Sequence, residues 1–373
     1  MMRLIRLRGL WLKELYQIVR DPSSILVAFF LPLLILFLNG YALSLDFNNI
    51  KTGIVIESPS TDANKFLAGF IGSPYFNVTV SENRKDIEAL LVAGKIRGMI
   101  VIPENFDKDN FEARFLSPIQ ILTDGSEPNT AAVLENYTRG VWQNWLIQKA
   151  QEKGEELTIP INIESRIWYN QENISPYAII PGSLALIITL VGNLLTALVV
   201  AREWERGTME SLMTTPVSIL ELIFGKLIPY FVLGLGTLCL CVAVSIFIYH
   251  VPFRGSIFLI LLVGSLYLLA ALTFGLLIST LARNQFIAAQ VSIFTAFLPA
   301  FLLSGFLFEI SNMPLPIQAF SYIFTARYLV SSLQTLFLVG NVWQIVLFDC
   351  SCILAILLIL MFLVLRSTRK RLD

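Results

Sequence analysis

Six long apolar runs dominate the hydrophobic pattern of this chain. The first covers residues 24–45, and the others cover 177–200, 227–249, 256–280, 286–308 and 343–365. Each run has at least the ~20 residues that a helix needs to cross a bilayer. The pattern predicts an α-helical polytopic membrane protein, with transmembrane helix 1 at 24–45 and transmembrane helices 2–6 within 177–365.

The residues before the first run alternate apolar and basic positions. Leu4, Leu7, Trp11, Leu15 and Ile18 recur at helical spacing, with basic residues between them. Segment 1–23 is therefore predicted to form an amphipathic helix on the cytoplasmic membrane surface. No small-residue cleavage site follows the apolar run, so we expect an uncleaved anchor rather than a signal peptide.

Segment 46–176 is polar and mixed in character. Short β-rich stretches at 53–57, 76–80, 97–102 and 119–123 alternate with helical patterns at 83–93 and 129–151. This alternation predicts an α/β domain inserted between helices 1 and 2. Residues 124–129 suggest either a metal or sugar site or a turn into the next helix. Their glycine and proline favour the turn.

Basic residues indicate the topology. Short loops on the N-terminal side carry thirteen, whereas those on the other side carry only Arg254 and Arg327. The positive-inside rule places both termini, including the tail 366–373, in the cytoplasm. The α/β domain 46–176 is then extracytoplasmic. The thirteen are Arg3, Arg6, Arg8, Lys13, Arg20, Arg202, Arg206, Lys226, Arg283, Arg366, Arg369, Lys370 and Arg371.

A charged island at 201–216 separates the second and third runs. Gly207 interrupts its helical pattern, Thr208 is predicted to cap a new helix, and Glu210 falls in the first turn, where the helix dipole favours an acid. Pro216 ends the segment. We expect a short helix across the cytoplasmic face with acids positioned to meet a partner. The alternative is an ordinary solvated loop.

Composition excludes several function classes. The chain is 55% hydrophobic and 14% charged, whereas soluble domains carry about 25% charged residues. Its formal net charge of zero gives no reason to expect nucleic-acid binding. The cysteines form two pairs spaced i, i+2 on opposite helix sides, and there is a single histidine, so no metal site is expected.

Energy for transport is expected to come from outside this chain. Only Asp349 is an ionisable residue within a predicted span, which argues against an ion-coupled carrier. Gly225 and Lys226 lack the earlier glycine and the following hydroxyl of a phosphate-binding loop. The chain is therefore not expected to be an enzyme or to bind ATP itself.

Segment 309–342 is interrupted by Pro314 and Pro316 and carries an apolar face around Phe320 and Leu329. Two interpretations remain open. The segment is either an outer re-entrant pair of short helices, whose polar ends must be buried in protein, or an interfacial amphipathic helix.

The charged island also carries a family resemblance. Residues 202–212, followed by Pro216 and by Gly225 and Lys226, resemble the cytoplasmic coupling segment of ABC-type export permeases of the second export class. Stretches 17–24, 93–98, 121–130 and 283–286 extend the resemblance to bacterial inner-membrane drug-efflux permeases of this class. The resemblance covers nearly the whole chain.

This resemblance implies a permease that exports drugs or other small amphiphilic compounds. A separate ATPase subunit would bind ATP and Mg and dock at the coupling helix 201–216, and the region 309–342 would be re-entrant. The implied partners are this ATPase, a second related permease or a second copy, and a periplasmic adaptor. The ATPase-coupling residues are Arg202, Glu203, Glu205, Arg206, Gly207, Thr208 and Glu210, with Arg202 and Arg206 also expected to bind anionic lipid headgroups.

Two other function classes fit the pattern less well. A receptor or sensor would use the α/β domain to bind an extracytoplasmic ligand, but it would need an output domain larger than segment 366–373. A membrane-embedded enzyme would need polar residues clustered within the spans. The pattern therefore favours the permease.

Overall fold

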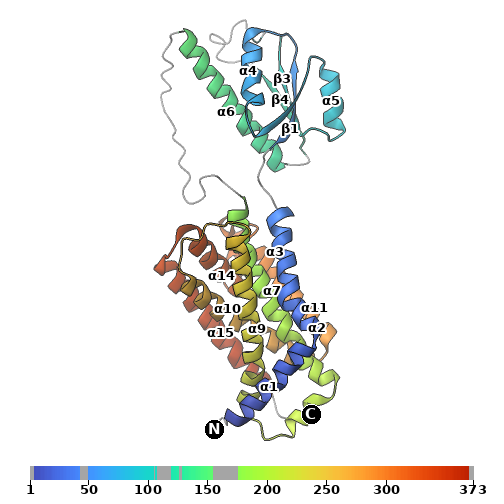
Figure 1. The fold of residues 1–373 in the computed structure, drawn as a ribbon, viewed down its shortest axis with the longest axis vertical. Coiled ribbons are helices and arrows are strands. Elements are labelled where there is room, and N and C mark those ends of the chain that lie inside the picture. The colour runs from blue at the N-terminus through green and yellow to red at the C-terminus, as the bar shows by residue number, and fades with distance from the viewer. Residues whose placement is uncertain are drawn as a thin grey trace. The chain divides into compact units, whose positions relative to one another are not determined.

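A computed structural model describes residues 4–42, 49–104, 106, 119–125, 128–153 and 175–368 (Figure 1). The chain divides into two compact units. One, the helical unit, comprises Met1–Ser44 together with Ile167–Asp373, and the other, the α/β unit, comprises Leu45–Arg166.

The α/β unit contains a four-stranded sheet in the order β2-β1-β3-β4. Its strands are β1 (Ile50–Ile56), β2 (Phe76–Ser81), β3 (Gly98–Ile102) and β4 (Gln120–Thr123). The central β1 is parallel to β2 and β3, with Ile54 opposite Val80 and Ile100, whereas β4 is antiparallel to β3. All four predicted strands are confirmed.

Helices cover both faces of this sheet. α4 (Thr61–Ile71) and α6 (Pro128–Lys153) pack on one face around Phe66 and Trp145, and α5 (Arg84–Val92) packs on the other through Ile87 (Figure 1). α5 and α6 were predicted, but α4 was not. Its start is nevertheless encoded, because the Ser60 hydroxyl accepts a hydrogen bond from the backbone N–H of Ala63 at 3.1 Å.

The predicted turn after β4 is described only in part. Asp124 lies 3.7 Å from a guanidinium nitrogen of Arg97, and residues 126–127 lie outside the described part of the chain. No group of three or more His, Cys, Asp or Glu with metal-binding geometry occurs among the described residues.

The helical unit contains, in its described part, six helices long and apolar enough to cross a membrane. This confirms the predicted fold class of six apolar spans with an α/β sheet domain after the first. The six are Pro22–Tyr41 (from α2, Pro22–Ile25, through the π-turn η1, Leu26–Phe30, into α3, Leu31–Ala42), α7 (Ser175–Glu205), α9 (Ile219–Phe247), α10 (Ile257–Ala282), Gln285–Leu303 (α11, Gln285–Ser292; η2, Ile293–Phe297; α12, Leu298–Leu303) and α15 (Trp343–Ser367).

α7 is the central helix of this unit. In its most apolar window 89% of the residues are buried, compared with 22% for Gln285–Leu303 and 17% for α15. α7 lies among its neighbours in Figure 1, whereas the other two spans lie at the periphery. A helix buried on all sides needs small or internally satisfied polar residues at its contacts.

Polar contacts and small residues join α7 to α10 along their length. The hydroxyls of Thr189 and Tyr267 are hydrogen-bonded, and the Thr196 hydroxyl donates to the carbonyl oxygen of Leu272 at 2.8 Å. Further along, the Ser279 hydroxyl oxygen accepts from two backbone N–H groups of α7, at 2.9 and 3.0 Å. Gly275 permits the approach, since a Cβ there would clash with the backbone of Asn193.

The interrupted segment before α15 forms a bent helix pair. α13 (Leu315–Ser321) and the helix formed by α14 (Thr325–Gln334) and η4 (Thr335–Val339) meet at 87°. α14 is largely buried, as the re-entrant alternative requires. Asp349 of α15 is 4% exposed and accepts a hydrogen bond from the Ser332 hydroxyl at 2.8 Å, which makes it a helix-contact residue.

Candidate coupling site

The amphipathic helix α1 (Leu4–Arg20) docks on the start of α9. A Cβ at Gly225 would lie 2.9 Å from Leu10 Cδ1, so only glycine allows the observed approach of the two helices. The Trp11 indole N–H donates to the carbonyl oxygen of Phe224 at 3.4 Å, and the Arg6 guanidinium donates to that of Pro216. α1 therefore contacts both α9 and the end of the charged island.

Four charged side chains from three helices meet beneath α1. We call Lys13, Glu14, Glu203 and Lys226 the charge cluster. Lys226 Nζ lies 2.5 Å from Glu203 Oε2 and 3.2 Å from Glu14 Oε1. Lys13 Nζ lies 3.1 Å from Glu14 Oε1 and also pairs with Glu203. Two cations and two carboxylates thus alternate across α1, α7 and α9.

The charge cluster is buried except at Lys13. Glu14, Glu203 and Lys226 are each at most 3% exposed. Burial by itself lowers the pKa of Lys13, but the carboxylates of Glu14 and Glu203 outweigh it and raise the pKa above the ordinary value for lysine. Lys13 therefore keeps its positive charge at neutral pH. Removal of any one member leaves an uncompensated buried charge.

A second ion pair joins the end of α7 to the start of the first span. Asp21 accepts hydrogen bonds from the Ser23 N–H at 3.2 Å and the Ser24 hydroxyl at 2.8 Å, and it also pairs with Arg202. Burial by itself would raise the pKa of Asp21. The hydrogen bonds from Ser23, Arg202 and Ser24 outweigh it and lower the pKa to about 2.

The same end of α7 contacts the turn between α10 and α11. Glu205 accepts from the backbone N–H of Gln285 at 2.8 Å. This contact lies at the N-terminus of α11, where the helix dipole favours a carboxylate. Arg202 donates to the Gln285 side-chain oxygen at 3.2 Å, and the Arg283 guanidinium lies 4.7 Å from the centre of the Trp204 ring. The last turn of α7 thus contacts both the start of the first span and the start of α11.

The helix break occurs at the predicted residue but with a different cap. Gly207 has φ +67°, and α8 (Thr208–Met213) begins immediately after it. Such a left-handed conformation favours glycine. The Thr208 hydroxyl donates to the carbonyl oxygen of Glu203 at 3.3 Å. Thr208 therefore caps the end of α7, and its predicted role as the N-cap of α8 is wrong because α8 starts at Thr208 itself.

Two further expectations for the island need correction. Glu203 was expected as an acid facing a partner, but it is 3% exposed because two lysines enclose it. Arg202 was expected at lipid headgroups, but it is 8% exposed and pairs with Asp21. Arg206, Gly207 and Thr208 are exposed, as is Glu205 beside Gln285. The side chain of Glu210 lies outside the described part of the structure.

The expectation that Asp349 is the sole ionisable residue within the spans applies to the predicted bounds 177–200 and 227–249, and the helices extend beyond these bounds. α7 continues to Glu205 and α9 begins at Ile219, so Glu203, Glu221 and Lys226 lie on spanning helices. Five members of the site were not among the predicted site residues: Lys13, Glu14, Asp21, Lys226 and Gln285. Glu14 carried a signal, because it is the single acid in a helix that is otherwise apolar and basic.

The chain is similar throughout its length to curated transport permeases. It is 47% identical over 368 residues to "Probable multidrug ABC transporter permease YbhS" of Escherichia coli, covering 99% of this chain and 98% of that protein. It is 27% identical to "Probable multidrug ABC transporter permease YbhR" (89% and 90% covered) and 25% identical to "Inner membrane transport permease YhhJ" (91% and 90% covered), both from the same bacterium.

The family model described as "ABC-2 family transporter protein" matches residues 22–366, which include every span and the charged island. The permease component of these transporters carries no ATPase domain of its own and works with a partner ATPase. Together with the six spans, these similarities show that the chain belongs to the ABC-2 family and is the multi-pass permease of an ABC exporter.

Proposed function

We propose that this permease exports drugs or other small amphiphilic compounds, and that ATPase movement reaches its spans through the charged island and α1. The cargo proposal rests on the similarity to YbhS and YbhR, whose names describe multidrug permeases. The coupling proposal rests on one observation, the charge cluster that ties α1, α7 and α9 together.

Coupling is mechanical in this proposal. A surface segment can drive a membrane helix only if the connection between them is stiff. Buried ion pairs with good geometry are stiff, because separating them exposes charges to a medium that solvates them poorly. Lys13 and Glu14 move with α1, whereas Glu203 moves with α7 and Lys226 with α9. Displacement of α1 must therefore shift both spans or break the cluster.

The docking surface and the transmission residues are separate in this proposal. Exposed Arg206, Gly207 and Thr208, together with Glu210, contact the ATPase subunit, which binds ATP and Mg. Glu203 and Arg202 carry the movement inward, and Glu205 passes it to α11 through Gln285. The exposed side chain of Arg206 is also placed to meet anionic headgroups.

We further propose how the chain is oriented in the membrane and with which permease it pairs. The coupling helix and both termini face the cytoplasm of a bacterium, and the α/β unit lies outside the inner membrane, where it meets cargo or a periplasmic adaptor. The pathway forms between this chain and a second permease. YbhR, a related permease, indicates a heterodimer, and self-pairing is the other arrangement.

The test of coupling uses the complex of this chain with its ATPase, reconstituted in proteoliposomes. Glu203→Gln leaves two lysines facing one carboxylate. We expect it to reduce cargo-stimulated ATP hydrolysis and transport by at least tenfold. The double variant Glu203→Gln with Lys226→Met restores charge balance, and we expect it to recover stability but not coupling.

The control is Glu135→Gln, which removes the carboxylate of an exposed i,i+4 pair with Arg139 in the α/β unit. It should behave as wild type. Wild-type coupling in Glu203→Gln, at normal insertion and ATPase association, would contradict the assignment.

Topology is tested by labelling with a membrane-impermeant maleimide in a cysteine-free background. Lys85→Cys in the α/β unit and Arg206→Cys in the island are both at exposed positions. The first should be labelled from the periplasmic side, the second from the cytoplasmic side. Labelling of both from one side would overturn the proposed orientation.

A further inference from the structure

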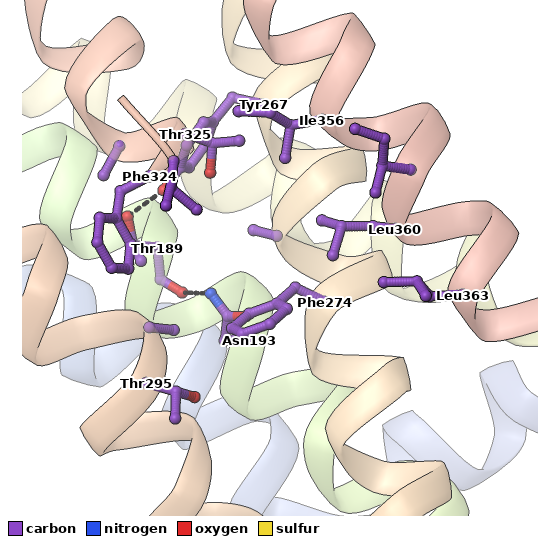
Figure 2. A pocket seen from close by; sticks show the side chains of 15 residues that line it. Thr189, Asn193, Tyr267, Phe274, Thr295, Phe324, Thr325, Ile356, Leu360 and Leu363 are labelled. Atoms are coloured by element: carbon purple, nitrogen blue, oxygen red, sulfur yellow. Dashed lines mark hydrogen bonds between the residues drawn. The ribbon is translucent and has the colours of Figure 1, made fainter. Parts of the chain in front are cut away.

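A cavity of about 440 Å³ lies within the helical unit, separate from the coupling site (Figure 2). We call it the lateral cavity. Its walls come from α7, α10, η2, α15 and the bend between α13 and α14. Its volume falls within the range of about 300–1,000 Å³ that holds small-molecule ligands in proteins.

The walls of the lateral cavity are apolar and uncharged. Phe274 of α10 and the α15 residues Ile356, Leu360 and Leu363 are among its lining residues, and none of the fifteen lining residues carries a charge. Figure 2 shows Thr189 and Asn193 of α7 on the side opposite Leu360 and Leu363. An ion placed here would lack a counterion, which strongly disfavours a charged ligand.

Three hydroxyls of the cavity, those of Thr189, Tyr267 and Thr295, have already donated their hydrogens. The Thr189 hydroxyl donates to the carbonyl oxygen of Ala185 at 2.6 Å, so Tyr267 must be the donor in the bond between their hydroxyls. The Thr295 hydroxyl donates to the carbonyl oxygen of Val291 at 2.6 Å. What these side chains can still offer to a ligand is therefore acceptor capacity.

One acceptor lacks a partner. The amide nitrogen of Asn193 donates to the Thr189 carbonyl oxygen at 2.7 Å, and this orientation is fixed because two facing oxygens would repel. Asn193 Oδ1 is left buried with no hydrogen-bond partner among the described residues, on a side chain that is 3% exposed. An unsatisfied acceptor at this depth is destabilising, so a ligand with an O–H or N–H donor gains affinity by meeting it.

The mouth of the lateral cavity opens at the periphery of the unit. Thr295 is exposed, and Ile323 and Ile359 are 62% and 59% exposed. They belong to the two peripheral spans and to the helix bend between them. η2 is a π-turn, a departure from the α-helix that often occurs at functional sites. A ligand can therefore enter sideways from the hydrocarbon region.

We propose that the lateral cavity binds an uncharged amphiphile that enters from the bilayer, with its chain between α10 and α15 and its donor head on Asn193 Oδ1. This inference rests on the proposed export of amphiphiles, since it names the class of cargo and the place where the cargo is first held. The class comprises long-chain molecules with a hydroxyl or amide N–H head.

The test uses the full-length permease with its co-purifying subunits in phosphatidylcholine nanodiscs. The probe is a long-chain alcohol that carries a diazirine and an alkyne, and the matched probe is its methyl ether, which has no donor. After illumination, peptides are mapped by mass spectrometry. We expect the alcohol to label α7 and α15 peptides about tenfold more than the ether.

Two variants separate the head contact from the cavity. Asn193→Leu should reduce alcohol labelling to the level of the ether and leave ether labelling unchanged. Ala296→Phe should fill the cavity and abolish labelling by both probes. Ala355→Phe is the matched control, because Ala355 is exposed on α15 and does not line the cavity. It should label as wild type does.

Equal labelling by alcohol and ether would overturn the inference, as would labelling that Ala296→Phe leaves intact. Efficient cross-linking of Thr295→Cys to a second copy, with no probe labelling, would overturn it in favour of a permease interface. ATP-dependent export measured on the same preparations separates the two proposals. Export without labelling refutes the lateral cavity alone, whereas labelling without export of any amphiphile refutes the proposed cargo class alone.

Discussion

The charge cluster and the lateral cavity are two buried polar sites on the same central helix, and they differ in how their polar groups are satisfied. In the charge cluster, the Oε2 atoms of Glu14 and Glu203 make no hydrogen bond, but both carboxylates are ion-paired with lysines. Asn193 Oδ1, on the same helix as Glu203, has neither a hydrogen bond nor an ion pair among the described residues. A site whose charges neutralise one another holds the helices in a fixed arrangement. A site with an unused acceptor and empty volume has capacity for a ligand. This difference is the reason why we propose transmission of movement for the first site and ligand binding for the second.

The largest effect should come from Lys226→Met, which removes the cation between two buried carboxylates. We expect a loss of about 3–5 kcal/mol in the free energy of unfolding, because one partner of a buried pair is deleted. Denaturant titration in mixed micelles measures it. Glu88→Gln, in an exposed pair with Arg84, should change stability by less than about 1 kcal/mol. A change below about 1 kcal/mol in the free energy of unfolding of Lys226→Met would contradict the view that the charge cluster holds the helices in a fixed arrangement.

Gly225→Ala tests whether the charge cluster depends on the docking of α1. The added methyl would overlap Leu10, and overpacking of this kind costs about 1–3 kcal/mol. Leu10→Ala in the same chain should recover part of that loss. Unfolding measurements on the single and double variants provide the comparison. Strict additivity of the two changes would contradict the proposed close contact.

Asp21→Asn tests whether the ion pair between Asp21 and Arg202 makes a pH-dependent contribution to stability. The pKa of Asp21 is lowered from 3.8 to about 2 in the folded protein, so its charge stabilises the fold above about pH 4. This contribution is lost as the pH falls from about 4 toward 2. Asparagine can still cap α2, so we expect a loss of about 1 kcal/mol at neutral pH, moderated by partial exposure. Melting curves of the two proteins should converge near pH 2, and a constant difference would exclude titration of Asp21.

The smallest effect is expected for Asn193→Leu. The substitution removes one hydrogen bond to Thr189 but also removes the buried acceptor. Because these two changes nearly cancel, we expect the free energy of unfolding to change by less than about 0.5 kcal/mol. The loss of head-group selectivity described above should accompany it. Strong destabilisation in denaturant titration would mean that Asn193 stabilises the fold, as the charge cluster does, rather than binding a ligand.

Sequence reasoning succeeded where the pattern is local. The six spans follow from run length, and the four strands follow from short β-rich stretches between turn residues. α4 was missed although Ser60, Phe66 and Phe70 carry the cap and the helical spacing, so the information was present and unused. The helix break at Gly207 was predicted because a glycine between charged helical turns is itself a local signal.

The site could not be predicted in the same way. Lys13, Glu203 and Lys226 are far apart in the sequence, and each alone resembles an ordinary residue at a membrane surface. Their pairing depends on the crossing of α1 over α7 and α9, a tertiary property that no local pattern encodes. The same holds for Asn193, whose unused acceptor is evident only once α10 and α15 are packed around it.

The hydrogen bonds and close packing between α7 and α10 affect how movement at the charge cluster reaches the lateral cavity. Hydrogen bonds at three positions and the close contact at Gly275 join α7 and α10 along their length, so we expect the two helices to move as one rigid body. Glu203 lies ten residues, about 15 Å, from Asn193 along α7. Because the two helices are joined along their length, we expect a displacement at the Glu203 end of α7 to move the cavity wall directly, without a relay of side chains. In the proposed mechanism, the separation between the coupling site and the bound cargo is then fixed by the length of α7.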